Sequence, residues 1–405
     1  MYDAPGDAMK ALNHIRLLDL THMLSGPYAS MMLADLGAET IKIEPPGKGE
    51  GTRRLLEKDP NNSLNGMGAY FLTLNRNKKS VTLNLKSEEG LALFYELVKT
   101  ADIVLDNFSA GVTSRLKIDH AHLSAINPRI ITATITGFGE TGPDNKRPAF
   151  DMVAQAMGGG MSITGQPGSP PTRAGIPIGD LGGGLMGVVG VLAALVAREQ
   201  TGRGQHVDIG MLDAQISLLN YMGTMHHLSG EVPGQLGNAH FVHVPYNTFP
   251  VRDGHIIIAV ITDNFWANLM ALVDAPDLDT VENEGQPGRW QNKAIINQRL
   301  SEIFQTNTQA YWIEQLHAAR IPCAPVNNFP QALSEPQVLA RNMVVEVAHP
   351  LGGSVKMPGN PVKLSETHEE TFTPPPLLGQ HTDEVLQALG KSSDDIAKLR
   401  EAGAI

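Results

Sequence analysis

The feature that most constrains the fold is an alternation of strand-like and helix-like segments, which begins at residue 15. Short apolar runs alternate with stretches of helical periodicity, and the connections between them are short. Parallel strands need helical crossovers, so this order predicts an open parallel sheet with helices on both faces. The strands expected are residues 15–20, 38–44, 79–85, 102–108, 129–139 and 205–211, and the helices 25–37, 87–101, 123–127, 181–200 and 212–229.

The character of the sequence changes near Gly230. Residues 244–260 read as a β-hairpin around Asp253-Gly254, and further helical patterns follow it. The tail after Pro336 has too little apolar periodicity for a core of its own. We therefore expect a discontinuous, Rossmann-like large domain and a smaller α+β domain, with the large one formed by residues 1–225 and 331–405 and the small one by 226–330.

Composition sets the class of protein and of partner. The chain has 405 residues, 42% hydrophobic and 18% charged, as in globular proteins, and its net charge of −11 argues against a nucleic-acid partner. A single cysteine, Cys323, excludes an internal disulfide and fits a reducing compartment. Residues 1–10 contain no apolar core of a signal peptide, and the apolar stretch 184–196 is short for a membrane span. A cytoplasmic protein without a membrane partner is expected.

One motif points away from the function. Residues 137–142 match GxGxxG and follow a predicted strand, as in dinucleotide-binding proteins. The fingerprint requires a helix that starts at the last glycine, whereas Pro143 and Pro148 bracket a loop here. The sequence also lacks GxxxxGK[ST], HExxH and CxxC. We expect no bound nicotinamide cofactor, no P-loop and no metal site.

Asp180 is the strongest candidate for chemistry. It precedes three glycines, Gly182, Gly183 and Gly184, at the start of a long apolar helix. An aspartate at this position is commonly only a helix N-cap. However, the glycines leave its carboxylate open to a bulky ligand, and each weakens the helix by about 1 kcal/mol relative to alanine. That cost suggests close packing or ligand access.

From end to end the chain resembles the class III (CaiB/BaiF, formyl-CoA transferase-like) coenzyme A transferases. The resemblance rests on many blocks in the right order: LLDLTHMLSGPYAS, LGAETIKIE, NRNKKSVTLNLK, ADIVLDNF, TGFGETGP, PIGDLGGGLMG, TGRGQHVDIGMLDA, RIPCAPVNN and PPPLLGQHTDEVL. It implies that Asp180 is the nucleophile and that the chain is a ring interlocked with its twin in a homodimer. It also implies a set of CoA-contacting residues: Lys86, Asn107, Phe108, Arg115, Arg147 and Met211. Taken singly, Phe108 and Met211 could be core, and Lys86 and Arg115 solvated surface charges.

The resemblance further implies CoA transfer from an acyl-CoA to a carboxylic acid through an aspartyl-CoA thioester, with CoA as a substrate and no permanently bound cofactor. Succinyl-CoA and a dicarboxylate are the substrates expected. Oxyanion donors are expected among the glycines 182–184 or residues 237–239, and a lid near Gly237. The candidates for binding the acceptor are His22, Arg53, Arg54, Arg173, His240 and His243.

Departures from the family's sequence pattern restrict the substrates and the reaction that we expect. Pro45 and Leu24 stand where formyl-CoA transferases have arginine and glutamine, and their tetraglycine loop is absent from residues 237–246, which argues against formyl and oxalate substrates. The α-methylacyl-CoA racemases, of the same fold, need two opposed bases. Phe150 and Pro250 stand where racemases have a histidine and a glutamate, and neither side chain can carry a proton. Transfer is therefore favoured over racemisation. A CoA-binding protein without turnover is the remaining alternative.

Overall fold

The computed structural model describes residues 10–367 and 370–405. Residues 1–9, most of the stretch in which no signal peptide was expected, lie outside the described residues. The chain divides into two compact units, treated separately below. The first comprises Met1–Gly160, Arg173–Met225 and Gln337–Ile405, and the second Met161–Thr172 and His226–Pro336.

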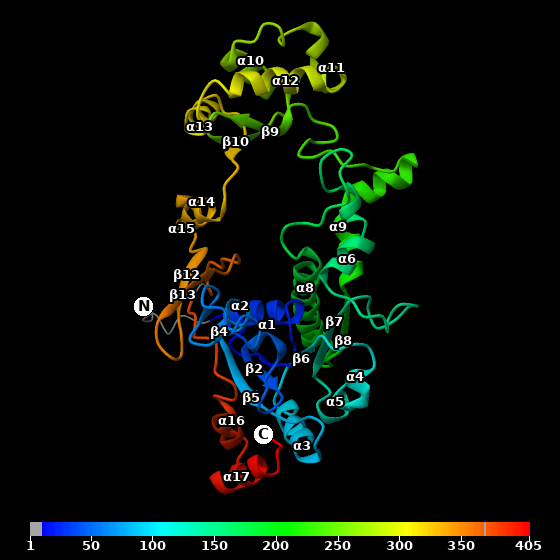
Figure 1. The fold of residues 1–405 in the computed structure, drawn as a ribbon. Coiled ribbons are helices and arrows are strands. Elements are labelled where there is room, and N and C mark those ends of the chain that lie inside the picture. The colour runs from blue at the N-terminus through cyan, green and yellow to red at the C-terminus, as the bar shows by residue number, and fades with distance from the viewer. Residues whose placement is uncertain (1–9, 368–369) are drawn as a thin grey trace, which may run out of the picture. The chain divides into compact units, whose positions relative to one another are not determined.

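The first unit is built on a six-stranded sheet with the order β5-β2-β1-β6-β7-β8 (Figure 1). All of its neighbouring strands are parallel. Each strand overlaps one that the sequence predicts, so the prediction of a parallel α/β sheet is confirmed. The strands are β1 (Arg16–Asp19), β2 (Glu39–Glu44), β5 (Lys78–Thr82), β6 (Ile103–Asp106), β7 (Ile131–Thr136) and β8 (His206–Gly210).

Helices cover both faces of this sheet, because successive strand residues point to opposite sides. Leu17 belongs to one core, with residues of α1 (Ser25–Asp35) and α8 (Ile178–Thr201). Leu18 belongs to the other, with residues of four helices. These are α3 (Glu88–Val98), α5 (His120–Ile126), α16 (Thr382–Ala388) and α17 (Ser393–Glu401).

The chain order reverses between β1 and its neighbour β6. Strands added after β1 extend the sheet one way through β2 and β5, and those after β6 extend it the other way through β7 and β8. Ligands of open α/β sheets bind in the crevice beyond the strand ends at such a switch point. Residues 20–24 and 107–108, which directly follow β1 and β6, therefore mark the expected ligand side.

Smaller elements complete the first unit and its connections. The residues after the GxGxxG match form a loop up to α6, as expected. The smaller elements of the first unit and its connections are η1 (Gly51–Arg53), β3 (Ser63–Leu64), β4 (Met67–Gly68), α2 (Ala69–Leu74), α4 (Val112–Arg115), α6 (Asp151–Met157), α7 (Gly160–Ile163), α9 (Met211–Ser229), α15 (Pro336–Ala340), β12 (Val344–Ala348) and β13 (Ser354–Pro358).

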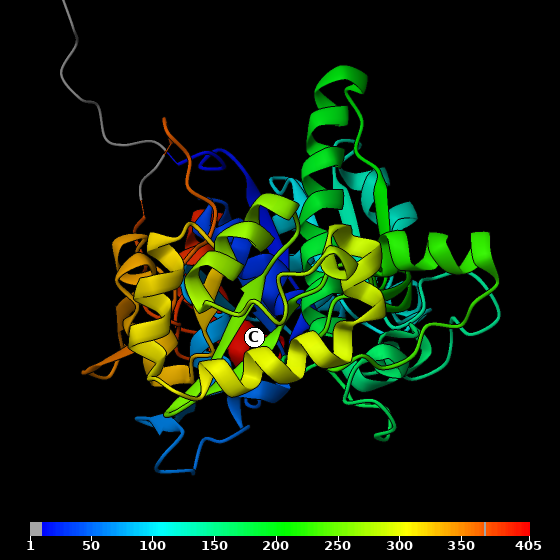
Figure 2. The same cartoon turned by 90° about the horizontal axis from the view of Figure 1, so that it is seen from above.

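The second unit packs helices on a three-stranded antiparallel sheet of order β11-β10-β9 (Figures 1 and 2). The predicted hairpin forms, with β10 starting at Gly254. Cys323 is half-buried in β11, and burial raises the pKa of its thiol to about 11, so it stays protonated. The elements are β9 (Tyr246–Val251), β10 (Gly254–Ala259), β11 (Cys323–Pro325), α10 (Asp263–Val273), η2 (Val281–Asn283), α11 (Gly285–Gln291), α12 (Lys293–Phe304), α13 (Gln309–Ala318) and α14 (Phe329–Ser334).

Helix α8 is longer than its apolar stretch suggested. With 24 residues it is, among the described helices, the one long and apolar enough to cross a membrane. One side of it is part of the core of the first unit through Val188, Val191 and Ala194. The core helix of a soluble protein passes the same test of length and composition, so the helix by itself is weak grounds for a membrane span.

Candidate functional site

The first turn of α8 carries Asp180 and is capped by another acid. One carboxylate oxygen of Asp151 accepts from the backbone N–H of Gly179 at 2.8 Å and of Asp180 at 3.3 Å. The other oxygen accepts from Nε2 of the buried Gln155 at 2.7 Å. A carboxylate at this end also interacts favourably with the helix dipole. Asp151 therefore takes the role of cap that Asp180 would have under the purely structural interpretation, and leaves the Asp180 carboxylate available.

The carboxylate of Asp180 is unusual in its protonation. Burial, together with the negative charge of Asp151, raises its pKa to about 6. Burial raises the pKa of the Tyr70 phenol, and the negative charges of Asp180 and Asp151 raise it further. At neutral pH Asp180 is mostly ionised, yet more basic than an exposed aspartate. This combination suits a carboxylate nucleophile.

Neither Asp151 nor Tyr70 was singled out from the sequence as part of the site. Asp151 stands beside Phe150, in the triplet that was considered only for racemase bases. Tyr70 lies in α2, more than a hundred positions before Asp180. The only local signal for Asp151 was that an acid stands where a loop gives way to a helix, which is common for ordinary helix caps.

The glycines after Asp180 are explained by close packing. A Cβ at Gly183 would lie 2.9 Å from Cγ of Met211, and one at Gly184 would lie 2.6 Å from the carbonyl oxygen of Ser25. Gly184 is one turn beyond Asp180, so the start of α1 lies next to the first turns of α8. Met211 is buried and forms part of this packing.

The structure changes the expected source of oxyanion donors. Residues 182–184 lie inside α8, where backbone N–H groups bond to carbonyls four residues earlier. By contrast, the N-cap of α1 makes no side-chain cap bond, and Ser25 and Gly26 donate their N–H groups to no described acceptor. These two donors, with the positive end of the α1 dipole, are better placed for a negative charge near Asp180.

Side chains from neighbouring strands hold the loop before α1. Lys42 donates to the carbonyl of Thr21 at 2.7 Å, and Asp19 accepts from the N–H of Thr21 at 2.9 Å. The amide of Asn107 accepts from His22 N–H at 2.9 Å and donates to His22 C=O at 2.7 Å. The side chain of Asn107, expected to contact CoA, is thus used to fix the loop.

Two of the expected CoA residues share a pocket of about 620 Å³ at the switch point. The ring of Phe108 lies 5.4 Å from that of His22, and the exposed Lys86 lies at the rim. Most of the wall is apolar, which suits a flat heteroaromatic group. The lining residues include Leu20, His22, Ile43, Pro45, Leu83, Asn84, Leu85, Lys86, Phe108, Leu116 and Gly403.

Arg115 lines a second pocket, of about 890 Å³, together with Lys146. Neither side chain has a hydrogen bond or ion pair with any described residue. Arg147, the residue expected from the sequence, instead pairs with Asp144 at 3.3 Å and lies 5.4 Å from the Phe138 ring. Two unpaired cations in one cavity favour an anionic ligand such as a phosphate.

The floor of this second pocket is a chain of hydrogen bonds. Glu140 contacts Nε2 of His206 at 2.9 Å, and Thr132 Oγ1 lies 2.8 Å from Nδ1 of His206 and 3.1 Å from Nδ1 of His120. The bond to Glu140 raises the pKa of His206, whereas burial lowers that of His120. The geometry is consistent with His206 donating to both Glu140 and Thr132 and with His120 accepting from Thr132.

Most candidates for acceptor binding are already engaged. Arg53 makes two bonds to Glu44, at 2.6 and 2.7 Å. Arg54 donates to the carbonyl of Lys48 at 2.8 Å, and the exposed Arg173 only reaches the Ala174 carbonyl at 3.4 Å. A bidentate clamp on a carboxylate needs a guanidinium group whose N–H donors are not already used. All three arginines use donors within the chain, and Arg173 makes the weakest such contact.

His240 and His243 belong to the second unit. Nδ1 of His240 accepts from the backbone N–H groups of Val242 and His243, at 3.0 and 3.1 Å. Its ring stacks on Tyr246 at 5.0 Å, and burial, with His243 nearby, lowers its pKa. This fixes a neutral imidazole that offers Nε2–H as a donor.

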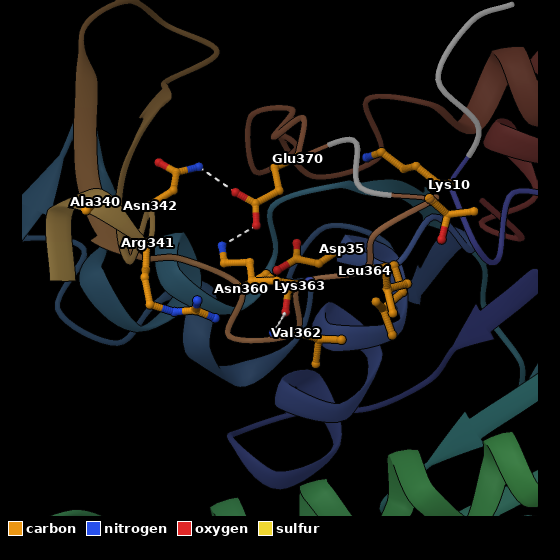
Figure 3. A pocket seen from close by; sticks show the side chains of 12 residues that line it. Lys10, Asp35, Ala340, Arg341, Asn342, Asn360, Val362, Lys363, Leu364 and Glu370 are labelled. Atoms are coloured by element: carbon orange, nitrogen blue, oxygen red, sulfur yellow. Dashed lines mark hydrogen bonds and ion pairs between the residues drawn. The ribbon is translucent and has the colours of Figure 1, made fainter. Parts of the chain in front are cut away.

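Figure 3 shows a further pocket of about 280 Å³, near the tail of the chain. Lys363 pairs with Glu370, which also accepts from Asn342 at 2.6 Å. Asp35, in its wall, is held by the buried Arg76 at 2.7 Å. Its acids are therefore compensated, and none of the sequence-predicted site residues lines it.

Known proteins resemble this chain in sequence and in fold. The family described as CoA-transferase family III matches residues 12–382. The chain is 39% identical to the acetyl-CoA:oxalate CoA-transferase of Acetobacter aceti, over 88% of this chain and 91% of that protein. It is 34% identical to the human succinyl-CoA:glutarate CoA-transferase, over 98% of this chain and 90% of that protein. A crystal structure of a CaiB/BaiF family protein from Brucella suis superposes with a TM-score of 0.84 at 32% identity, covering 94% of this chain and all of that one.

An open parallel sheet with a basic carboxylate at a glycine-rich helix start is thus the framework of a CoA-transferring enzyme. The chain belongs to CoA-transferase family III.

The charge of Asp151 predicts a pH effect. Activity that needs ionised Asp180 should fall as the pH drops through about 6. Asp151→Asn keeps an oxygen for the cap but removes the negative charge, so it should lower the pKa of Asp180 and move the acidic limb of the rate profile to lower pH. Profiles of kcat for wild type, Asp151→Asn and the control Asp144→Asn measure this. An unmoved limb in Asp151→Asn would contradict the coupling.

Proposed function

We propose that the protein transfers CoA from an acyl-CoA to a dicarboxylic acid through a covalent intermediate on Asp180. The observation that carries the proposal is the Asp180 carboxylate, half-buried and more basic than usual, with its capping role taken by Asp151. Oxalate and glutarate, in the names of the two relatives, are both dicarboxylic acids, and of the two only oxalate is disfavoured by Leu24 and Pro45. Succinyl-CoA is the donor we expect.

Each chemical step exchanges one acyl bond for another. Asp180 attacks the thioester carbonyl of the donor, the C–S bond breaks, and an acyl-aspartyl anhydride and CoA thiolate result. The thiolate then attacks the aspartyl carbonyl and releases the donor acid, which leaves an aspartyl-CoA thioester. The acceptor carboxylate attacks this thioester, and the returning thiolate cleaves the new anhydride to give acceptor-CoA and free Asp180. The thioester is conserved, so the cycle needs no further energy source.

The tetrahedral intermediates carry an oxyanion that needs donors. We assign this role to the N–H groups of Ser25 and Gly26, which no described acceptor occupies and which lie at the positive end of α1. Loss of one such donor typically costs about 3 kcal/mol of transition-state stabilisation. The clamps on Thr21 and His22 support this role, because they fix the loop before any substrate binds.

The two pockets divide the CoA molecule between them in this proposal. The adenine lies in the largely apolar pocket with Phe108, with Lys86 at its rim, and phosphate groups lie near Arg115 and Lys146. CoA enters as a substrate, and no permanently bound cofactor takes part. Cytoplasmic location, expected from the sequence, stays a prediction.

A covalent adduct tests the proposal directly. Incubation with succinyl-CoA should give a species heavier by CoA less one water in intact-mass spectra, because the aspartyl-CoA thioester accumulates without acceptor. Asp180→Ala and Asp180→Asn should form none, while the control Asp151→Asn should retain it. An adduct that persists in Asp180→Ala would refute the assignment. No adduct with any of a panel of acyl-CoAs, together with α-proton exchange from a branched acyl-CoA in heavy water, would favour a racemase.

The neighbouring residues Lys146 and Arg147 offer a matched test of the phosphate site. Lys146→Ala removes an unpaired cation from the pocket, so KM for the acyl-CoA should rise about ten-fold with little change in kcat. Arg147→Ala removes a cation already paired with Asp144 and should leave KM nearly unchanged. Initial-rate kinetics at fixed acceptor decide between the two. The reverse order of effects would restore Arg147 as the ligand.

We also propose that the active form is a homodimer, interlocked as the family resemblance implies. Supporting this, Leu185, Val189 and Val196 form an exposed apolar stripe on α8, and Val189 and Val196 are 61% and 66% exposed. Val189→Asp should shift the sedimentation-equilibrium mass from dimer towards monomer, whereas Glu199→Ala, a change at an exposed polar residue in the last turn of α8, should not. A wild-type monomer would refute the dimer.

A further inference from the structure

Residues 403–405 fold back against the apolar pocket that holds Phe108 and Lys86. Ala404 is fully buried and Ile405 is 6% exposed. Ile405 belongs to the same apolar cluster as Leu83 and Phe94, on one face of the sheet. Gly403 itself lines the pocket. These residues are therefore part of the pocket wall and of the core beneath it.

Asn84 connects this segment to the residues at the pocket rim. Its backbone N–H donates to the Ala404 carbonyl at 2.8 Å, and its side-chain Nδ2 donates to the Gly403 carbonyl at 3.2 Å. Its side-chain oxygen accepts from the N–H of Lys86 at 3.2 Å, and its carbonyl from the N–H of Ser87 at 3.0 Å. A single asparagine thus fixes Gly403 on one side of the pocket and the backbone of Lys86 on the other.

We propose that residues 403–405 and Asn84 form a preorganised wall that determines the affinity for the adenosine end of CoA, apart from the chemistry at Asp180. The inference rests on the proposed function, since it assumes that this pocket takes that end of the substrate. Ile405 is a positioning residue here, because it acts through Gly403, whereas Asn84 lines the pocket itself and also holds Gly403 and Lys86 in place. The glycine at 403 fits this role, since its φ of +68° is one that glycine adopts without strain.

The physical reason is that an unconstrained wall would have to be ordered by each ligand that binds. A wall fixed in advance by hydrogen bonds and core packing removes that cost from the binding free energy. Loosening the wall should weaken binding of any ligand that reaches the pocket. It should not affect a substrate too short to reach it, nor the reaction of a substrate already bound.

A truncated donor separates these effects. Succinyl-pantetheine carries the thioester but lacks the adenosine and its phosphates, so it should react at Asp180 without contacting the wall. Asn84→Ala loses the side-chain hydrogen bonds to Gly403 and Lys86, and Ile405→Ala loses core packing next to Gly403. In both variants KM for succinyl-CoA should rise about three- to ten-fold with kcat unchanged. KM and kcat for succinyl-pantetheine should match those of wild type. Ile396→Ala is the matched control, because Ile396 is buried in the same cluster but belongs to α17 and not to the segment 403–405 that Asn84 binds.

The alternative outcomes are distinct. Equal losses with both donors, or an equal loss in Ile396→Ala, would overturn the proposal in favour of a purely structural role, as would unchanged KM values. If wild type transferred no CoA at all, the proposed function would fail instead. Calorimetry with adenosine 3′,5′-bisphosphate still tests the wall in that case, since its affinity should drop in Asn84→Ala and Ile405→Ala but not in Ile396→Ala. Equal affinity in all four proteins would overturn the inference.

Discussion

The close approach of α8 to α1 and β7 is the contact on which the site depends. It is possible only because α8 has glycine where side chains would otherwise separate the elements: a Cβ at Gly187 would lie 2.8 Å from Ile135, and one at Gly184 even nearer to the Ser25 carbonyl. The helix accepts a propensity penalty at each glycine, and core packing offsets it. In return, the start of α8, which carries Asp180, lies against the start of α1, whose Ser25 and Gly26 N–H groups have no described acceptor.

Near this contact the protein buries charged side chains that are paired with side chains of opposite charge. Asp19 is fully buried, and the Lys42 and Lys78 charges outweigh the effect of burial and hold its pKa well below the usual range. Such buried networks cost desolvation and are stable only when their members are paired. Here they fix the loop before α1 in one conformation. Asp180 differs because its burial is not offset by a cation and its neighbour Asp151 is another acid, so both effects raise its pKa and keep it basic, as suits a nucleophile.

Local patterns predicted the framework better than the pairing of side chains. All six strands of the parallel sheet were predicted, and α3 begins directly after Ser87, its N-cap, at the start of the predicted helix 87–101. The pairing of Arg147, expected from the sequence to contact CoA, with Asp144 could not be predicted, because it depends on how the loop between them folds. The capping of α8 by Asp151 joins residues 28 positions apart and leaves no local signature.

The sequence by itself determined the α/β class, the family and the position of the one carboxylate before a glycine-rich helix. These follow from short-range periodicity, turn chemistry and motif order, which are properties of neighbouring residues. Only the tertiary structure decided that Asn107 clamps a loop, that the donors of α1 rather than of α8 are free, and that Gly403 lines a pocket beside Asn84. These facts depend on which distant segments meet, and on which polar groups each has already satisfied when they do.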